Sequence, residues 1–221
     1  MGTSPVRALI VDDEALVRSA LRVFLQGADD IVVVGEASDG DDALQLIEGS
    51  RPDVVLMDVQ MPRMNGVEAT TKLKARFPAV HVIALTTFSS ESALIPMLRA
   101  GASGFLVKDT DPDDIVEAVR QARDGEYVLS RRVTSQLVSS VLESPPLTSV
   151  QLGASEQLTP RERDVVELLA QGKSNAEIAK ALFLSEATVK AHLGQVMAKW
   201  GVRDRVQALI RAVQAGIVTI G

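Results

Sequence analysis

Carboxylates, a hydroxyl and a lysine stand at the ends of four strand-like runs in the first half of this chain. Asp12 and Asp13 end VRALIVDD, Asp58 ends DVVLMD, Thr86 ends HVIALT and Lys108 ends GFLVK. In an open parallel sheet the carboxyl ends of the strands share one edge, where ligands bind, so these side chains can converge in space. The sequence therefore predicts a site for a divalent metal ion and a phosphoryl group.

Each residue type suits one part of that chemistry. Asp13 is the first choice for a direct ligand and Asp12 for a direct or water-mediated one, because Mg²⁺ commonly uses one or two carboxylates with waters and phosphate oxygens. The Asp58 carboxylate can attack a phosphoryl group, and a metal relieves the repulsion between the two anions. Thr86 can donate a hydrogen bond to a phosphoryl oxygen, and Lys108 supplies a compact cation.

Each residue also has an ordinary structural explanation. Asp12 and Asp13 could simply stabilise the start of the following helix, whose dipole favours acidic side chains. Asp58 could open a loop, Thr86 could be an ordinary strand residue, and Lys108 could be solvated. Their joint occurrence on successive strand ends favours the metal and phosphoryl site.

The elements that must position these residues alternate along the first half of the chain. Apolar runs predict strands at 6–11, 31–37, 54–58, 81–86 and 104–108. Helical patterns lie between and after them, near 14–26, 40–49, 65–76, 90–100 and 112–123. This order predicts five βα units, with a doubly wound parallel sheet covered by helices on both faces.

Charge is divided unevenly along the 221 residues. Residues 1–124 carry 12 Lys+Arg against 20 Asp+Glu, whereas residues 157–221 carry 9 against 6. The basic second part permits DNA binding, although the whole chain has a net charge of -6. The chain has no cysteine, which excludes disulfides and thiolate metal sites. Its apolar runs are too broken to span a bilayer, so we expect a cytoplasmic protein that has no membrane segment.

Residues 125–156 join the two parts. Apolar residues at helical spacing in SRRVTSQLVSSVLE predict a short helix that starts at Ser130. The following SPPLTSVQLGASE, with paired prolines and small polar residues, predicts a flexible tether. We therefore expect two domains, 1–124 and 157–221, with a linker between them.

The second domain is predicted to be all-α, with four short helices. Thr159–Glu162 and Ser174–Glu177 are capping boxes, each of which starts a helix. Ser185 caps a third helix that runs to Trp200, and a fourth covers about 204–215. A tight turn between the middle pair is typical of a helix-turn-helix module.

Residues 5–124, with the acid pair, the DVQMPRMNG loop and the GASGFLVKD segment, resemble the receiver domain of two-component response regulators. The resemblance implies a flavodoxin-like strand order 2-1-3-4-5 and phosphorylation of Asp58 by a sensor histidine kinase. It implies a Mg²⁺ site formed by Asp12, Asp13, Asp58 and the backbone carbonyl of Gln60.

The resemblance also assigns a switch. Thr86 and Lys108 would hold the phosphoryl group, and Phe105 would turn inward when Thr86 moves. An ordinary core role is the alternative for Phe105, since an aromatic residue in a strand is usually buried. Pro96 departs from the expected pattern, because it removes a hydrogen bond inside the predicted helix 90–100 unless that helix starts late. This helix belongs to the face that receivers commonly use to dimerise.

Residues 157–218, with the motif NAEIA and LSEATVKAH, closely resemble the LuxR-type DNA-binding domain. Together the two domains resemble the NarL/FixJ family of response regulators. By this resemblance the helix 175–183 braces the DNA backbone, the helix 186–200 enters the major groove, and the last helix takes part in a homodimer.

Residues 186–200, placed at 100° steps, form two stripes. The apolar stripe consists of Val189, Leu193, Val196 and Trp200. The opposite stripe consists of Ala187, Ala191, Gly194 and Ala198, so the surface predicted to face the groove is nearly bare.

Small side chains allow close approach and contact with thymine methyl groups, but they cannot make bidentate contacts to bases. We therefore expect apolar contact by Ala191 and modest direct readout by Lys190 and Gln195. Phosphate contacts are expected from Thr188, His192 and Lys199. A solvated helix face is the alternative for the two lysines, and packing at the helix edge is the alternative for His192.

The sequence thus predicts a response regulator, not an enzyme, in which phosphorylation of Asp58 controls sequence-specific binding to double-stranded promoter DNA. A metal-dependent phosphatase of the haloacid-dehalogenase type is one alternative, but such enzymes place a D-x-D pair at the first strand, where this chain has adjacent acids. An RNA-binding antiterminator with a receiver is a second alternative, which the helix-turn-helix pattern disfavours.

Overall fold

The computed structural model describes residues 4–87, 93–126, 128–129, 133–134, 157–202 and 205–218. Contacts within the chain divide it into two units, Met1–Val128 and Leu129–Gly221, which are described separately. The helix predicted from Ser130 and the tether after it lie mostly outside the described residues; within that segment, Val133 and Thr134 are helical.

The first unit contains a sheet with the strand order β2-β1-β3-β4-β5-β6. Its first five strands are β1 (Val6–Val11), β2 (Ile31–Ala37), β3 (Val54–Asp58), β4 (His81–Thr86) and β5 (Gly104–Val107). These five pair in parallel, which confirms the predicted order 2-1-3-4-5. A two-residue strand, β6 (Val128–Leu129), adds an edge next to β5 that the sequence did not predict.

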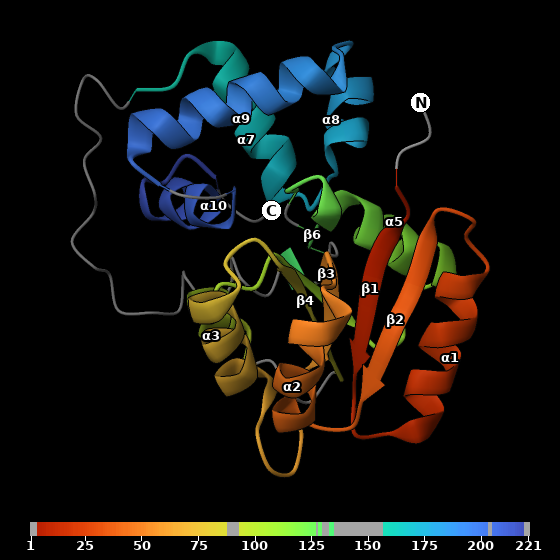
Figure 1. The fold of residues 1–221 in the computed structure, drawn as a ribbon. Helices are drawn as coiled ribbons and strands as arrows, with labels where there is room; N and C mark the ends of the chain where they lie inside the picture. The colour runs from red at the N-terminus through yellow and green to blue at the C-terminus, as the bar shows by residue number, and fades with distance from the viewer. Residues whose placement is uncertain are drawn as a thin grey trace. The chain divides into compact units, whose positions relative to one another are not determined.

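Helices cover both faces of this sheet. They are α1 (Ala15–Gln26), α2 (Gly40–Ser50), α3 (Gly66–Arg76), α4 (Leu94–Ala100) and α5 (Pro112–Arg123). The helices α1 and α5 pack together on one face, and α2, α3 and α4 follow one another on the other (Figure 1). Because both faces are covered, strand β3 is apolar throughout its body and buried along its whole length, as expected for a parallel sheet.

Pro96 is accommodated by the position of the helix around it. Helix α4 begins at Leu94, so Pro96 is its third residue. The first four N–H groups of a helix have no partner within the helix, so proline sacrifices no intrahelical bond there. Within the described residues, the helix predicted over 90–100 begins at Leu94, and 90–92 lie outside them.

The second unit contains four described helices, as the sequence predicts. They are α7 (Pro160–Ala170), α8 (Asn175–Leu182), α9 (Glu186–Trp200) and α10 (Arg205–Gln214). Both predicted capping boxes are present, with reciprocal bonds between Thr159 and Glu162 and between Ser174 and Glu177. The core is formed by apolar side chains of α7, α9 and α10, among them Val166, Val196, Trp200, Ala208 and Ala212.

Among the residues that the structure describes, no helix combines the length and the apolar character that a bilayer crossing requires.

Candidate functional site

The carboxylates predicted at the strand ends do converge. Asp12 and Asp13 directly follow β1, Asp58 ends β3, and β1 and β3 are adjacent strands. One oxygen atom from each of the three carboxylates lies within 4.8 Å of the other two. Asp12 and Asp58 are buried and Asp13 is exposed, so the cluster is open to solvent on one side.

Lys108, which directly follows β5, reaches into this cluster. Its Nζ lies 2.8 Å from Asp12 Oδ2, 3.2 Å from Asp58 Oδ2 and 3.2 Å from Glu14 Oε1. The contact with Asp12 Oδ2 is the shortest of these three ion pairs. The ammonium thus bridges carboxylates from β1 and β3.

The electrostatics show that one lysine does not neutralise this site. Burial and the nearby charge of Asp12 raise the pKa of Asp58 to about 6, against the opposing effect of Lys108. Burial also raises the pKa of Asp12. Burial alone would lower the pKa of Lys108, but its contacts with Asp12 and Asp58 outweigh this and raise it. The cluster therefore has more negative charge than its lysine can balance, and a cation would stabilise it.

The donor set fits a hard divalent cation. Mg²⁺ prefers oxygen ligands, and here three carboxylates present oxygen atoms at one point. The buried Asp12 Oδ2 has Lys108 as its ion-pair partner and is assigned no hydrogen bond from the described residues, so it can still contribute to the ligand set of a cation. Asp13 and Gln60 both line an open pocket of about 460 Å³. Asp12, Asp13 and Asp58 could therefore hold such an ion.

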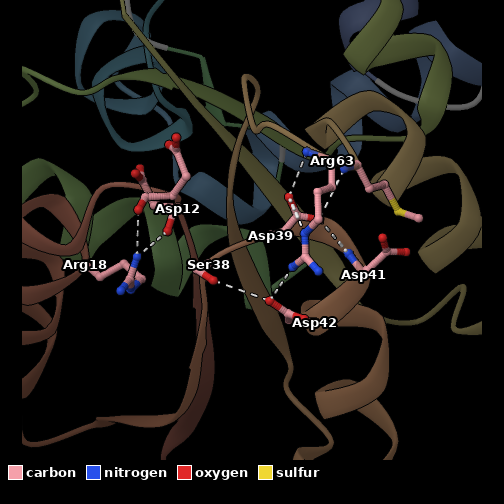
Figure 2. A network of polar contacts seen from close by, with 9 residues as sticks. Asp12, Arg18, Ser38, Asp39, Asp41, Asp42 and Arg63 are labelled. Carbon is pink, nitrogen blue, oxygen red and sulfur yellow. Dashed lines mark hydrogen bonds and ion pairs between the residues drawn. The ribbon is translucent and has the colours of Figure 1, made fainter.

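The backbone around the acid pair is fixed by Arg18 of α1. Its Nη1 donates to the carbonyl oxygens of Asp12 at 2.7 Å and Asp13 at 3.1 Å, as Figure 2 shows. Asp12 Oδ1 also accepts the backbone N–H of Glu14 at 2.9 Å. The N-cap of α1 is Glu14, which makes no side-chain cap bond, so Asp12 shapes the turn before the helix and does not cap it.

Gly66 fixes the other side of the site. A Cβ atom at this position would lie 2.2 Å from the carbonyl oxygen of Asp58, which no side chain could tolerate. The backbone N–H of Gly66 donates to the Val59 carbonyl at 3.0 Å. The start of α3 is thus packed directly against the end of β3.

The two predicted switch residues lie on neighbouring strands. Thr86 ends β4, is buried, and donates its hydroxyl to the carbonyl of Thr87 at 3.0 Å. Phe105 lies in β5 opposite Ala84 and is 2% exposed, so its ring occupies a buried position. The backbone N–H of Lys108 donates to the Thr86 carbonyl at 2.8 Å, which couples the two strand ends.

Helix α9 has the two faces that its spacing predicts. The buried face consists of Val189, Leu193, Val196 and Trp200. On the opposite stripe, Ala187, Ala191 and Ala198 are exposed. Lys190 and Gln195, which flank this stripe, are exposed as well. A Cβ atom at Gly194 would meet nothing within 4 Å, so this glycine is not required by packing within the chain.

The three residues predicted to contact phosphate are each partly buried or already hydrogen-bonded within the chain. The Thr188 hydroxyl lies 2.8 Å from Ser185 Oγ in the helix cap, and His192 is half-buried. Lys199 Nζ donates to the buried Glu162 carboxylate and, at 3.4 Å, to the carbonyl of Gln157. Lys199 is therefore engaged in an ion pair with α7.

Four functional neighbours were missed by the sequence reasoning. Glu14 shares Lys108, Arg18 holds the acid pair, Asp39 holds the loop after Asp58, and Glu162 pairs with Lys199. Of the four, only Glu162 belongs to a motif visible in the sequence, because it is the third helical residue of a capping box. The contacts of Glu14 and Asp39 join residues far apart in the sequence, whereas Arg18 acts on backbone carbonyls five and six residues before it.

Comparison with known proteins agrees with this geometry. The family described as "Response regulator receiver domain" matches residues 8–120, and "Bacterial regulatory proteins, luxR family" matches residues 156–212. The transcriptional regulatory protein YhcZ of Bacillus subtilis (strain 168) is 43% identical over 209 residues, which cover 95% of this chain and 96% of YhcZ. The nitrate/nitrite response regulator NarL of Escherichia coli (strain K12) is 37% identical over 206 residues, with 93% and 94% covered.

A solved structure supports the same assignment. The response regulator ChrA of a heme-sensing two-component system is 35% identical and superposes with a TM-score of 0.55, covering 97% of this chain and all of that one. The chain therefore belongs to the NarL/FixJ family of response regulators, with a receiver domain and a LuxR-type DNA-binding domain. Members of this family regulate transcription and are not enzymes in the ordinary sense.

Proposed function

We propose that phosphorylation of Asp58 by a sensor histidine kinase in the cytoplasm controls the binding of this protein to promoter DNA. The observation that carries the proposal is the Lys108 ammonium, which bridges the Asp12 and Asp58 carboxylates at one edge of the sheet. This arrangement combines a carboxylate nucleophile, oxygen ligands for a cation and a residue that can bind phosphate.

In the proposed transfer, an oxygen of Asp58 forms a bond to the donor phosphorus while the bond between that phosphorus and the donor breaks. Bound Mg²⁺, held by Asp12, Asp13, Asp58 and the Gln60 carbonyl, would reduce repulsion between the two anions. Lys108 already lies 3.2 Å from Asp58 Oδ2, so a small movement would bring it to a phosphoryl oxygen. The site acts on itself, so the receiver takes part only in its own phosphorylation and dephosphorylation.

Phosphorylation adds about 1.5 to 2 negative charges and three acceptor oxygens. Thr86 can donate to one of these oxygens after it releases the Thr87 carbonyl. We infer that this movement changes the packing around Phe105, whose ring is already buried, and alters the surface near α4 and β5. The output is then a shift between two populations of the same protein.

The proposed division of labour follows the linear order of the chain. Residues 1–124 form the receiver, 125–156 form the linker, and 157–221 bind DNA. We propose that Lys190 and Gln195 provide modest base readout and that Ala191 provides apolar contact within the major groove. Homodimers formed on phosphorylation or on DNA would place two copies of α9 on successive half-sites.

For phosphate contacts the proposal keeps Thr188 and His192 as backbone-contacting residues. Lys199 needs a different assignment, because moving its ammonium to DNA would leave Glu162 buried and unpaired. We therefore propose a structural role for Lys199. A binding-site selection that yields strong base preference at many positions of each half-site would contradict the bare recognition surface.

The test uses the full chain, a small phosphodonor and Mg²⁺. Asp58→Asn is expected to abolish phosphate incorporation, and Asp109→Asn, which removes a neighbouring carboxylate outside the cluster, is expected to retain it. DNA selected from random duplexes should bind more tightly to the phosphorylated protein than to the Asp58→Asn variant. Unchanged labelling of Asp58→Asn would overturn the site, and phosphate-independent DNA affinity would overturn the switch.

A further inference from the structure

Asp39, at the N-cap of α2, is a buried carboxylate outside the cluster that reaches the loop after Asp58. Its Oδ1 accepts the backbone N–H of Asp41 at 3.2 Å and that of Met64 at 3.1 Å, and its Oδ2 accepts that of Arg63 at 3.1 Å. Figure 2 shows Asp39 between the start of α2 and this loop. Two of its three backbone donors thus belong to a segment more than 20 residues away.

The charges around Asp39 strengthen this connection. Burial alone would raise the pKa of Asp39, but the backbone N–H donors and the Arg63 guanidinium outweigh it and lower the pKa. The guanidinium lies 3.6 Å from Asp39 Oδ2 and 2.8 Å from Asp42 Oδ2. Hydrogen bonds to a charged acceptor are roughly twice as strong as neutral ones, so Asp39 is a firm anchor.

The chain is built so that α2 and the loop can touch. A Cβ atom at Gly40 would lie 2.8 Å from the carbonyl oxygen of Met64 and 2.8 Å from Ala69 Cβ, so only glycine permits this approach. At its two ends the loop is closed by the bond from the Gly66 N–H to the Val59 carbonyl. Asp39 therefore connects the middle of this loop to the start of α2.

The same loop borders the acidic cluster. The backbone N–H of Gln60 donates to Asp58 Oδ1 at 3.4 Å, and Gln60 and Asp13 line the same open pocket. The path of the loop therefore decides where the carbonyl of Gln60 lies relative to the carboxylates.

We propose that Asp39 is a positioning residue for the metal site, which it serves by holding the loop that carries Gln60. The inference rests on the proposed function, in which the acidic cluster binds Mg²⁺. Asp39 itself does not touch the ion. Because Mg²⁺ demands near-ideal octahedral geometry, a loop that moves freely would present a poor ligand set, and affinity would fall. Residues that orient metal ligands typically change metal affinity about 10- to 100-fold when they are removed.

A purely structural role is the competing explanation, since Asp39 also caps α2. The two roles can be separated by Asp39→Ser. Serine is a good N-cap and retains the local bond to Asp41, but its short side chain cannot reach the N–H groups of Arg63 and Met64. Asp39→Asn is the second variant, which keeps the size and removes the charge.

The experiment measures the dissociation constant of Mg²⁺ by calorimetry on full-length protein, with unfolding followed in parallel. We expect Asp39→Ser to weaken Mg²⁺ binding about 10- to 100-fold and Asp39→Asn to weaken it less. Phosphorylation by a small phosphodonor should recover at high Mg²⁺. Two controls should bind Mg²⁺ as the wild type does: Asp42→Asn, which removes a partner of the Arg63 side chain, and Ile47→Val, which trims the buried face of α2.

The outcomes are distinguishable. If the wild type does not bind Mg²⁺, the proposed function of the cluster fails. If the wild type binds Mg²⁺ and both Asp39 variants match it within twofold, the proposed role of Asp39 is overturned. Equal weakening by Ile47→Val would also overturn it, because a general loss of stability would then explain the effect.

Discussion

Both units contain a buried carboxylate beside a lysine, and the two pairs behave in opposite ways. Asp58 shares Lys108 with Asp12 and Glu14, and its pKa is raised to about 6, chiefly by burial and then by the charge of Asp12. For Glu162 burial also acts to raise the pKa, but bonds from Lys199 and from the backbone of its own capping box outweigh it, and the pKa is lowered.

The difference separates a binding site from a structural contact. Glu162 has enough donors to remain charged at little cost, so nothing further is needed to stabilise it. Asp58 lies in a cluster that has fewer positive than negative charges. Binding of a cation would therefore stabilise the receiver. A buried carboxylate with an incomplete set of donors is thus a better sign of function than burial alone.

The largest expected effect comes from removing the lysine of the satisfied pair. Lys199→Met leaves Glu162 buried without its cation, and we expect the DNA-binding unit to lose about 2 to 3 kcal/mol, somewhat less than for a fully buried pair. Urea unfolding of the unit would measure this loss. Lys180→Met, at an exposed position on α8, is the control and should change stability little. Equal stability of the two variants would remove the contrast between the pairs.

Asp58→Asn should increase stability in metal-free buffer, whereas Lys199→Met should decrease it. A carboxyl group whose pKa is raised in the folded state contributes stability at low pH that is lost as the pH rises through about 6. The variant avoids this loss, so we expect it to exceed the wild type by about 1 to 3 kcal/mol at pH 7.5. Thermal unfolding between pH 4 and 8 should show this gap closing toward acid. A less stable variant at pH 7.5 would contradict the account.

Glu162→Gln should destabilise its unit by about 1 to 2 kcal/mol at neutral pH. Because the pKa of Glu162 is lowered in the folded state, its contribution is present above the ordinary value of 4.5 and is lost as the pH falls through the folded value. The gap between variant and wild type should therefore shrink in acid, and denaturant unfolding at pH 3 and 7 would measure it. A gap that is constant with pH would show that charge plays no part.

Gly194→Ala gives the smallest change in stability. Alanine should stabilise α9 by about 1 kcal/mol, since a Cβ atom meets nothing within 4 Å. If the bare face of α9 approaches DNA closely, the same variant should bind selected duplexes more weakly. Thermal unfolding and fluorescence anisotropy on one preparation would test both effects. A more stable variant with unchanged DNA affinity would show that close approach at this position is unnecessary.

The fold was predictable because the signals that specify it are local or periodic. Strand β3 reads as an unbroken apolar run that ends in Asp58, and the caps at Thr159, Ser174 and Ser185 mark helix starts within a residue. Convergence of the acidic cluster followed from the rule that parallel strands share one edge. Pro96 is compatible with a helix that starts at Leu94, whereas the sequence predicted a start near 90.

The partners of these residues were harder to predict. Arg18 and Asp39 act on backbone groups, which carry no signature of their own in the sequence. Lys199 looked like an exposed phosphate-binding residue at helical spacing, and only the packing of α7 against α9 brings Glu162 to it. The short strand β6 consists of two residues, too few to give a periodic pattern.

The cluster around Asp58 has fewer positive than negative charges, and it is expected to bind Mg²⁺. Binding can be measured by calorimetric titration of Mg²⁺ into the wild type and into Asp58→Asn at pH 7.5. We expect saturable binding of one ion by the wild type, and at least about tenfold weaker binding by the variant, since it loses a charged ligand. Absence of saturable binding to the wild type, or equal affinity in both proteins, would contradict this expectation.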